Sequence, residues 1–415
     1  MSDAPSPQPA VTGVPTPQRV LNANFLRLNV AAFLSMLTMS MFNLLPYYLE
    51  LRGASQGFYG AVAGSMGISN FIVMMAFGHT ADRWSRRTSV FIYSLPMVAA
   101  SGLAIMAMTQ SLNWYFLVRL LQGVYMGLGF PIMYAWVVEL TPPGRKHEAV
   151  ALFGVAGLTA NTLGPLIGEM ILNAQPDPNH PDAYLPVFWT SLVIMIGSAL
   201  SLFLVPSVKP ASSGEEERQS IMPLLRRPES QLLMIVTFVF GGMFGIYTSF
   251  GKNFTASLGL TYASVLFGTY SGGAIASRIL IRPMTRLLME RNLIPVGFVG
   301  VAFTFLLLAV AKQYPGLAFA GLCYGFGHGV LYPALFVRFL DMQRPSEIGR
   351  ATILYQGLFS AGWGFLPYLG GYYIQFTSFQ SLFSLIAGLC GIGMLLHLQA
   401  ERVVESRKQP ERGAS

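Results

Sequence analysis

Long runs of apolar residues, separated by short polar stretches, recur along the whole chain of 415 residues. A helix of about 20 apolar residues is long enough to cross the hydrocarbon core of a bilayer. This pattern predicts twelve membrane-spanning helices, near residues 25–46, 58–77, 88–108, 114–136, 148–172, 186–205, 231–250, 261–281, 293–311, 316–340, 350–374 and 379–398. The bilayer is therefore the expected solvent for most of the chain.

The composition excludes a water-soluble enzyme. Only 11% of the residues are charged and the mean hydropathy is +0.52, whereas soluble domains carry roughly 25% charged residues. Cys323 and Cys390 lie inside apolar runs, far from any Cys/His cluster, so we expect two free thiols and no metal. A phosphate-binding glycine loop and a nucleophile elbow are both missing from the sequence. We therefore expect no cofactor and no nucleotide hydrolysis, so the energy must come from an ion gradient or from the substrate gradient.

The Lys and Arg residues are distributed unevenly about the predicted spans. The tails and the even-numbered loops carry 22 of the 26, the other side carries Arg52, Lys252 and Lys312, and Arg119 alone falls within a span. The positive-inside rule then places both termini in the cytoplasm of a multi-pass membrane protein, which we expect in a bacterial inner membrane. The net charge of +8 thus reports orientation, and we expect no nucleic acid partner.

The second half of the chain repeats part of the first at a fixed offset of 202 residues. The matching positions are mostly Gly and Pro, whose backbone roles are specific: Gly123 and Gly325, Pro131 and Pro333, Pro143 and Pro345, Pro165 and Pro367, Gly168 and Gly370. We therefore predict a disordered tail over 1–22, six-helix halves over 23–206 and 231–398, a cytoplasmic linker over 207–230 and a tail over 399–415. Parallel halves with a site between them are a transporter architecture.

The loop after the second predicted span reads Gly78-His-Thr-Ala-Asp82-Arg83-Trp-Ser-Arg86-Arg87. This G-x-x-x-D-R-x-x-R-R pattern resembles the signature of the major facilitator superfamily, although Ser85 stands where that family usually has Gly. The resemblance implies an all-α membrane protein with twelve helices in two six-helix halves. Asp82 can accept hydrogen bonds from a helix N-terminus, and the three arginines can pair with acidic groups. We predict that these residues latch one conformation; the alternative is that the arginines only set the orientation.

Span 4 begins with Arg119-Leu-Leu-Gln122-Gly123, which is similar to the R-x-x-Q-G motif of the same family. A charge at this depth must face protein or water rather than lipid. We therefore place Arg119 and Gln122 on the substrate or proton pathway. The alternative is an arginine that is satisfied by backbone carbonyls and serves packing alone.

Span 5 contains Gly164-Pro165-Leu-Ile-Gly168-Glu169, which resembles the G-P-x-x-G-G element of proton-coupled exporters, the drug/proton antiporter branch of the superfamily. Small residues at this spacing allow close helix packing. Glu169 departs from the element because a second Gly is usual there. Arg119 and Glu169 both fall in the outer part of the membrane, so we predict that they form an ion pair; the alternative is that Glu169 simply reaches the outer interface.

His328 lies near the middle of span 10, with Tyr324 and Tyr332 one helical turn to either side. The resemblance implies that spans 1, 4, 7 and 10 line the central cavity, so His328 can titrate there or bind a substrate; packing against a neighbouring helix is the equal alternative. Tyr247 in span 7 and Asn43 in span 1 are weaker candidates. The 21 methionines are expected to fill the apolar core rather than carry copper.

These features favour a secondary transporter that exports an amphiphilic or drug-like compound in exchange for protons. An importer of a sugar, an organic acid or another metabolite is the alternative, and a membrane sensor or assembly factor without transport activity is a third. An intramembrane enzyme is disfavoured because no nucleophile and base stand out as a pair. We expect a monomer whose partners are a small-molecule substrate, protons and the lipid bilayer.

Overall fold

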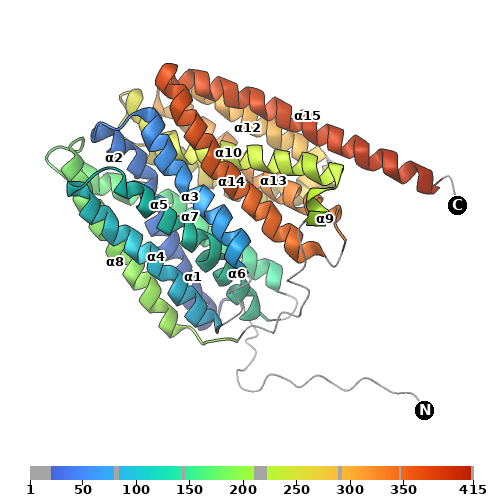
Figure 1. Ribbon diagram of the computed structural model, residues 1–415, viewed down its shortest axis with the longest axis horizontal. Coiled ribbons are helices and arrows are strands. Elements are labelled where there is room, and N and C mark those ends of the chain that lie inside the picture. The colour runs from blue at the N-terminus through green and yellow to red at the C-terminus, as the bar shows by residue number, and fades with distance from the viewer. Residues whose placement is uncertain are drawn as a thin grey trace, which may run out of the picture.

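The computed structural model describes residues 20–78, 84–142, 145–209, 222–287, 292–344 and 347–412, which form helices and turns and contain no β-strand (Figure 1). The helices before residue 207 are α1 (Ala23–Met41), α2 (Leu45–Leu51), α3 (Gln56–Phe77), α4 (Arg86–Met106), α5 (Trp114–Val124), α6 (Phe130–Glu139), α7 (Lys146–Asn173) and α8 (Leu185–Ser201). Those after it are α9 (Met222–Leu225), α10 (Pro228–Ser257), α11 (Ser264–Leu287), α12 (Leu293–Val310), α13 (Tyr314–Asp341), α14 (Ile348–Phe376) and α15 (Phe379–Arg412).

Two predicted spans are interrupted. A 3-10 turn over Phe42–Leu44 separates α1 from α2, and a π-helical turn over Tyr125–Gly129 separates α5 from α6. With each interrupted pair counted as one unit, ten described helices are long and apolar enough to cross a membrane. The two long helices outside that group are α11 and α14, so twelve spans remain a prediction.

Local chemistry fixes several helix starts. The side chain of Asn22 accepts hydrogen bonds from the backbone of Asn24 and Phe25 and so caps α1. Ser55 caps α3 in the same way. Ser85, the residue that departs from the family signature, caps α4 by accepting from the backbone of Thr88. The hydroxyl satisfies an N–H group that would otherwise lack a partner at the first turn of α4.

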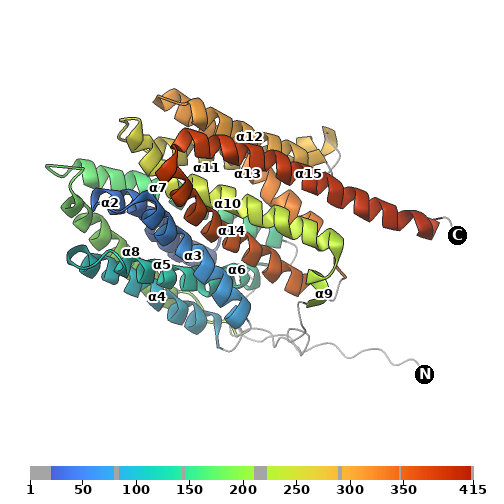
Figure 2. The same ribbon diagram turned by 45° about the horizontal axis from the view of Figure 1, so that its top comes forward.

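The helices pack as two groups. In the first group α1 packs on α7 and α8, and α4 on α5 and α8; in the second, α10 packs on α14 and α15, and α12 on α13 and α15 (Figure 2). The groups meet along two seams, α3 with α14 and α7 with α11. The first seam is very close, because a Cβ atom on Gly64 would lie 2.1 Å from the backbone oxygen of Gly364. The less apolar helices α11 and α14 thus both line the contact between the groups.

The sequence repeat corresponds to a repeat of helix bounds. Shifted by 202 residues, α7 would run from 348 to 375, and α14 runs over Ile348–Phe376. The same shift carries the unit of α5 and α6 onto 316–341, and α13 runs over Tyr314–Asp341. The π-helical turn has no counterpart, since α13 is a continuous α-helix. The two groups of helices are therefore called halves below.

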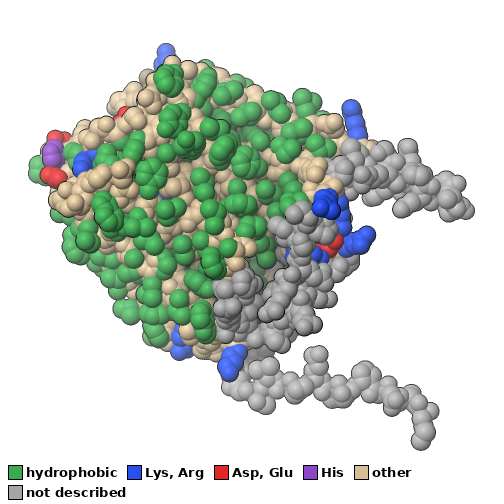
Figure 3. Space-filling model, viewed as in Figure 1, with side chains coloured by type: hydrophobic (Ala, Val, Ile, Leu, Met, Phe, Trp, Pro, Cys, Tyr) green, Lys and Arg blue, Asp and Glu red, His purple; other side chains and the backbone are tan. Residues whose placement is uncertain are grey.

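The bundle has two distinct ends. α1 begins and α15 ends at the same end, which we call the terminal end; the other is the opposite end (Figure 1). Lys and Arg side chains gather at the terminal end, while hydrophobic side chains cover the middle of the visible face (Figure 3). Large apolar side chains are also strongly exposed, such as Ile279 of α11 with 70% and Val310 of α12 with 72% of their surface exposed. Such a surface suits lipid rather than water.

Candidate functional site

Nine rings gather in the C-terminal half around His328, and we call them the aromatic cluster. They come from four helices: Phe240, Phe244 and Tyr247 from α10, Tyr270 from α11, Tyr324, His328 and Tyr332 from α13, and Phe359 and Trp363 from α14. Within α10 and α13 successive members are three or four residues apart, so each helix presents them on one face. The predicted residues Tyr247, Tyr324, His328 and Tyr332 are thus brought together.

The imidazole of His328 stacks on neighbouring rings, but only one of its two nitrogens has a hydrogen-bond partner among the described residues. Its ring lies 4.9 Å from that of Phe244 and 5.2 Å from that of Phe240, and its Nδ1 is 3.2 Å from the hydroxyl of Tyr270. Its Nε2 atom and the Tyr324 hydroxyl have no hydrogen-bond partner among the described residues. His328 and Phe244 are half-buried rather than sealed. The cluster therefore offers a ligand both aromatic surface and free polar atoms.

Tyr247 is held more firmly than its neighbours. Its ring stacks on Tyr324 at 4.2 Å and its hydroxyl donates to the backbone oxygen of Leu266 at 2.8 Å. Asn43 lies apart from the cluster, half-buried in the turn between α1 and α2, and its side chain makes no hydrogen bond to the described part of the chain. A role for Asn43 in the pathway stays a prediction.

Arg119 does not pair with Glu169, and the prediction of that ion pair is wrong. The guanidinium is 4% exposed and donates to the backbone oxygen of Phe42 and to the side chain of Gln122, both at 2.9 Å. The backbone oxygen of Phe42, in the 3-10 turn between α1 and α2, also accepts from the backbone N–H of Leu45. Backbone and amide oxygens therefore replace the carboxylate that the sequence suggested.

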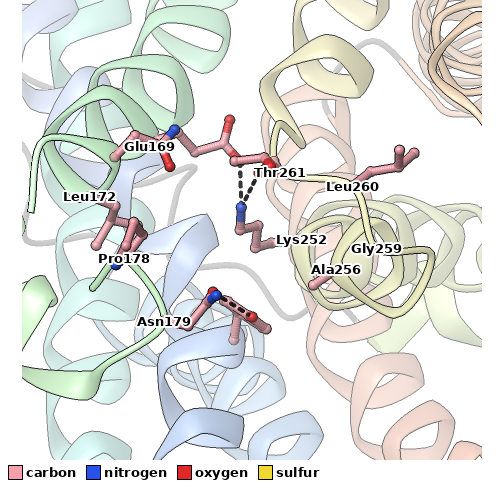
Figure 4. Close-up of a pocket in the computed structure, with 11 residues that line it drawn as sticks. Glu169, Leu172, Pro178, Asn179, Lys252, Ala256, Gly259, Leu260 and Thr261 are labelled. Atoms are coloured by element: carbon pink, nitrogen blue, oxygen red, sulfur yellow. Dashed lines mark hydrogen bonds and ion pairs between the residues drawn. The ribbon is translucent and has the colours of Figure 1, made fainter. Parts of the chain in front are cut away.

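Glu169 instead reaches across to the other half. Its carboxylate lies 2.9 Å from Lys252 Nζ of α10 and accepts hydrogen bonds from the backbone of Ala263 and Ser264, at 2.7 and 3.0 Å, where α11 begins (Figure 4). The side chain of Glu169 is 1% exposed and that of Lys252 is 7% exposed. A carboxylate at a helix N-terminus is also stabilised by the helix dipole. The contact joins α7 of the first half to two helices of the second.

A second polar contact crosses between the halves at the same end. The side-chain amide of Asn253 donates to the carboxylate of Glu50, which lies near the end of α2. We call Glu50, Glu169, Lys252 and Asn253 the inter-half lock. Glu169 and Lys252 also line a pocket of about 280 Å³ (Figure 4). This pairing could not be predicted from the sequence, because Lys252 belongs to no motif and its partner lies 83 residues away.

Gly164 and Gly168 position Glu169 by letting α7 approach the first span closely. A Cβ atom on Gly164 would lie 1.9 Å from the hydroxyl of Ser40, and one on Gly168 would lie 2.5 Å from the Leu44 side chain. Pro165 lies inside the same helix. The motif therefore serves helix packing here, and its last residue serves the lock.

At the terminal end two of the signature arginines contact residues of the first half. Arg86 pairs with Glu139 at 2.7 Å, and Arg87 donates to the backbone oxygen of Val205. Gly78 ends α3, while Asp82 and Arg83 lie outside the described residues. Arg86 thus finds an acidic partner as expected, but this pair does not cross between the halves.

The second half has its own ion pairs at the terminal end. Arg227 lies 2.9 Å from Glu347, which precedes α14, and Arg338 lies 2.6 Å from Glu401. Burial acts to raise the pKa of Glu347, but the hydrogen bonds from Arg227 and from the backbone of Arg344, together with their charges, outweigh it and hold this pKa below its usual value. These pairs fix the ends of α13, α14 and α15 to their neighbours.

The assignment of Lys and Arg residues from the sequence needs two corrections. Lys252 lies in α10 and is buried, and Arg278, which was counted with a loop, lies inside α11. Arg119 is therefore not alone among the cations within the helices. Lys252 lies in a helix because α10 extends to Ser257, beyond the predicted end of its span at 250, whereas Arg278 already fell within the predicted span over 261–281.

Comparison with known proteins agrees with this architecture. Staphylopine export protein of Staphylococcus aureus is 24% identical over 81% of this chain and 85% of its own length, and multidrug resistance protein 1 of Bacillus subtilis is 21% identical over 78% and 81%. Inner membrane transport protein YajR of Escherichia coli is 29% identical, but the match covers only 42% of this chain and 37% of that protein.

The fold and the family agree as well. The crystal structure of the nucleoside transporter NupG superposes with a TM-score of 0.74 at 15% identity, over 91% of this chain and 99% of that chain. The sequence model of the Major Facilitator Superfamily matches residues 28–336 and 233–415. The chain therefore belongs to the major facilitator superfamily and is a membrane transporter rather than an enzyme.

Proposed function

We propose that this transporter exports an amphiphilic small molecule from the cytoplasm in exchange for protons. The inter-half lock is the observation that carries the proposal, because it joins the halves through a carboxylate that can bind a proton. The names of two relatives, an export protein and a multidrug resistance protein, support the direction. We place the terminal end in the cytoplasm on the positive-inside rule, and with it a bacterial inner membrane.

The lock closes the opposite end of the bundle in the arrangement described above. Within the described part of the chain, the hydrogen bonds between the halves include those of Glu169 and Glu50 at that end and one near the middle, from Ser271 to the backbone oxygen of Leu158. Among the described residues no ion pair crosses between the halves at the terminal end. Release of a substrate to the opposite side then requires the lock to open, as alternating access demands.

Protonation of Glu169 would weaken the lock. A neutral carboxyl group no longer attracts the Lys252 ammonium, and its protonated oxygen no longer accepts from a backbone N–H. The Lys252 ammonium faces this carboxylate from α10, and backbone N–H groups at the start of α11 donate to it. The centre of the Tyr47 ring lies 5.5 Å from the same ammonium. The pocket beside the pair gives protons a route from the opposite side. We therefore assign proton binding to Glu169 and substrate binding to the aromatic cluster with His328.

The proposal is tested in inverted membrane vesicles that respiration has acidified inside. A panel of anionic, neutral and cationic amphiphiles is added, and loss of the pH gradient is followed with a fluorescent dye. At least one compound should dissipate the gradient with the wild-type protein and fail to do so with Glu169→Gln. If compounds enter the vesicles while the gradient stays intact, proton exchange is wrong.

A further inference from the structure

Arg278 extends from α11 toward the other half. Gly268 and Ser271 lie on the same face of α11, and they contact Thr162 and the backbone oxygen of Leu158 in α7. Arg278 follows Ser271 by seven residues, which is two helical turns. Its guanidinium occupies the space beside Gly154 of α7, since a Cβ atom there would lie only 2.8 Å from Arg278 Nη1. The cation therefore sits at the seam between the halves.

Arg278 also lies deep in the bundle, without a partner among the described residues. Nine residues separate it from Leu287 at the terminal end of α11, which is about 14 Å along the helix. It is exposed, and it forms no hydrogen bond or ion pair with the described residues. Ionisable side chains at such depth normally pair or line a water-filled path. The described part of the chain thus supplies no counter-charge to Arg278 at this depth.

The aromatic cluster lies within reach of this charge. Arg278 interacts electrostatically with His328 and Tyr270 of the cluster, and with Tyr134 of α6 in the other half. The cluster itself contains no carboxylate, and the lock carboxylates Glu50 and Glu169 lie at the opposite end, where each has a partner. The surroundings of the cluster therefore combine aromatic surface and free polar atoms with an uncompensated positive charge.

We infer that the transported compound is an aromatic anion, with its ring against Phe244 and Trp363 and its acidic group toward Arg278. A carboxylate or sulfonate would supply the missing counter-charge, and an arginine binds such groups through two hydrogen bonds. A cation would be repelled by Arg278 and would find no carboxylate in the cluster. The membrane potential, negative in the cytoplasm, would also drive such an anion outward. This inference rests on the proposed function and names its substrate class.

Binding to the purified full-length protein tests the substrate class without relying on transport. Equilibrium dialysis is done with radiolabelled 2-naphthylacetate, and competition is measured with 2-naphthylacetamide and 2-(2-naphthyl)ethylamine, which share the ring but are neutral and cationic. The acetate should bind most tightly and the amine most weakly. Arg278→Gln should weaken binding of the acetate about 10-fold or more, leave the amide unchanged and spare folding, and Arg278→Lys should restore part of the loss.

Two further variants locate the effect. Arg27→Gln removes an exposed arginine of α1 whose partner is a backbone oxygen, and it should bind the acetate as the wild type does. Phe359→Ala removes a ring of the aromatic cluster and should weaken the binding of the acetate and of the amide to the same extent. Equal binding of the three probes, no binding of any probe, or a wild-type affinity for the acetate in Arg278→Gln would overturn the inference. None of these results bears on proton exchange, which the vesicle assay tests separately.

Discussion

Replacing Glu169 by Gln should open the opposite end of the bundle. Gln keeps the size of the side chain but removes the charge, and its amide oxygen is the one acceptor left where two carboxylate oxygens now accept three hydrogen bonds, while its NH2 group faces a donor. The Lys252 ammonium would lose its charged partner and keep its bond to the backbone oxygen of Thr261. In the open arrangement water would hydrate both residue 169 and the Lys252 ammonium. The substitution therefore destabilises the closed arrangement alone.

The size of the effect follows from burial. Because the two side chains are 1% and 7% exposed, little solvent screening reduces their interaction, and removing one partner of such a pair costs about 3–5 kcal/mol. A cost of this size shifts the equilibrium between closed and open arrangements by roughly 10²- to 5 × 10³-fold. The matched control is Glu148→Gln in the same helix, because Glu148 pairs with Arg145 at the surface, with side chains 46% and 42% exposed. Such a pair is worth at most about 1 kcal/mol.

The assay is a distance measurement between spin labels. Labels are placed at Gln110 in the first half and Lys312 in the second, both exposed near the opposite end, after the free thiols of Cys323 and Cys390 are replaced by Ser. The control should give a single short distance, and Glu169→Gln should give a dominant longer one. A distribution unchanged in Glu169→Gln and in Lys252→Met would refute a closing role for the pair.

Three other predictions concern stability. Because Arg119 and Glu169 do not meet, their neutral replacements should be additive in a double-mutant cycle of thermal unfolding to within about 0.5 kcal/mol; strong coupling would contradict the separation seen here. Gly64→Ala should lower stability by about 1–3 kcal/mol through overpacking against Gly364, whereas Gly102→Ala, with nothing within 4 Å of the new Cβ, should not. Because the folded pKa of Glu347 lies below its usual value of 4.5, its ion pair stabilises the fold above pH 4.5, and this contribution is lost as the pH falls through the folded pKa; Glu347→Gln should remove that part of the pH dependence of unfolding.

Periodicity in the sequence is sufficient to predict the helices and the repeat. The apolar runs fall on the long helices, and the offset of 202 residues reproduces the bounds of α14 from those of α7. The spacing of Tyr324, His328 and Tyr332 also predicts a shared face correctly, because helical geometry alone decides it. Local pattern is sufficient wherever the partners lie on one helix.

Contacts between residues on different helices could not be predicted from local sequence patterns. Glu169 had a plausible neighbour in Arg119 at similar depth, but its actual partners, Lys252 and the start of α11, come from the other half. Phe244 and Trp363 look in the sequence like any lipid-facing or packing ring. Which face of a span turns to the other half is decided by packing between helices, and a single sequence does not encode that contact in any local pattern.

We propose that outward movement of the compound is tied to inward movement of protons through Glu169. The most direct measurement uses proteoliposomes that contain only this protein, with the compound most active in the vesicle panel in labelled form, and follows its flux and the proton flux together. We expect a fixed ratio of the two fluxes in the wild type and in Glu148→Gln, and loss of the proton flux in Glu169→Gln. A compound flux that is the same with and without a pH gradient would contradict it.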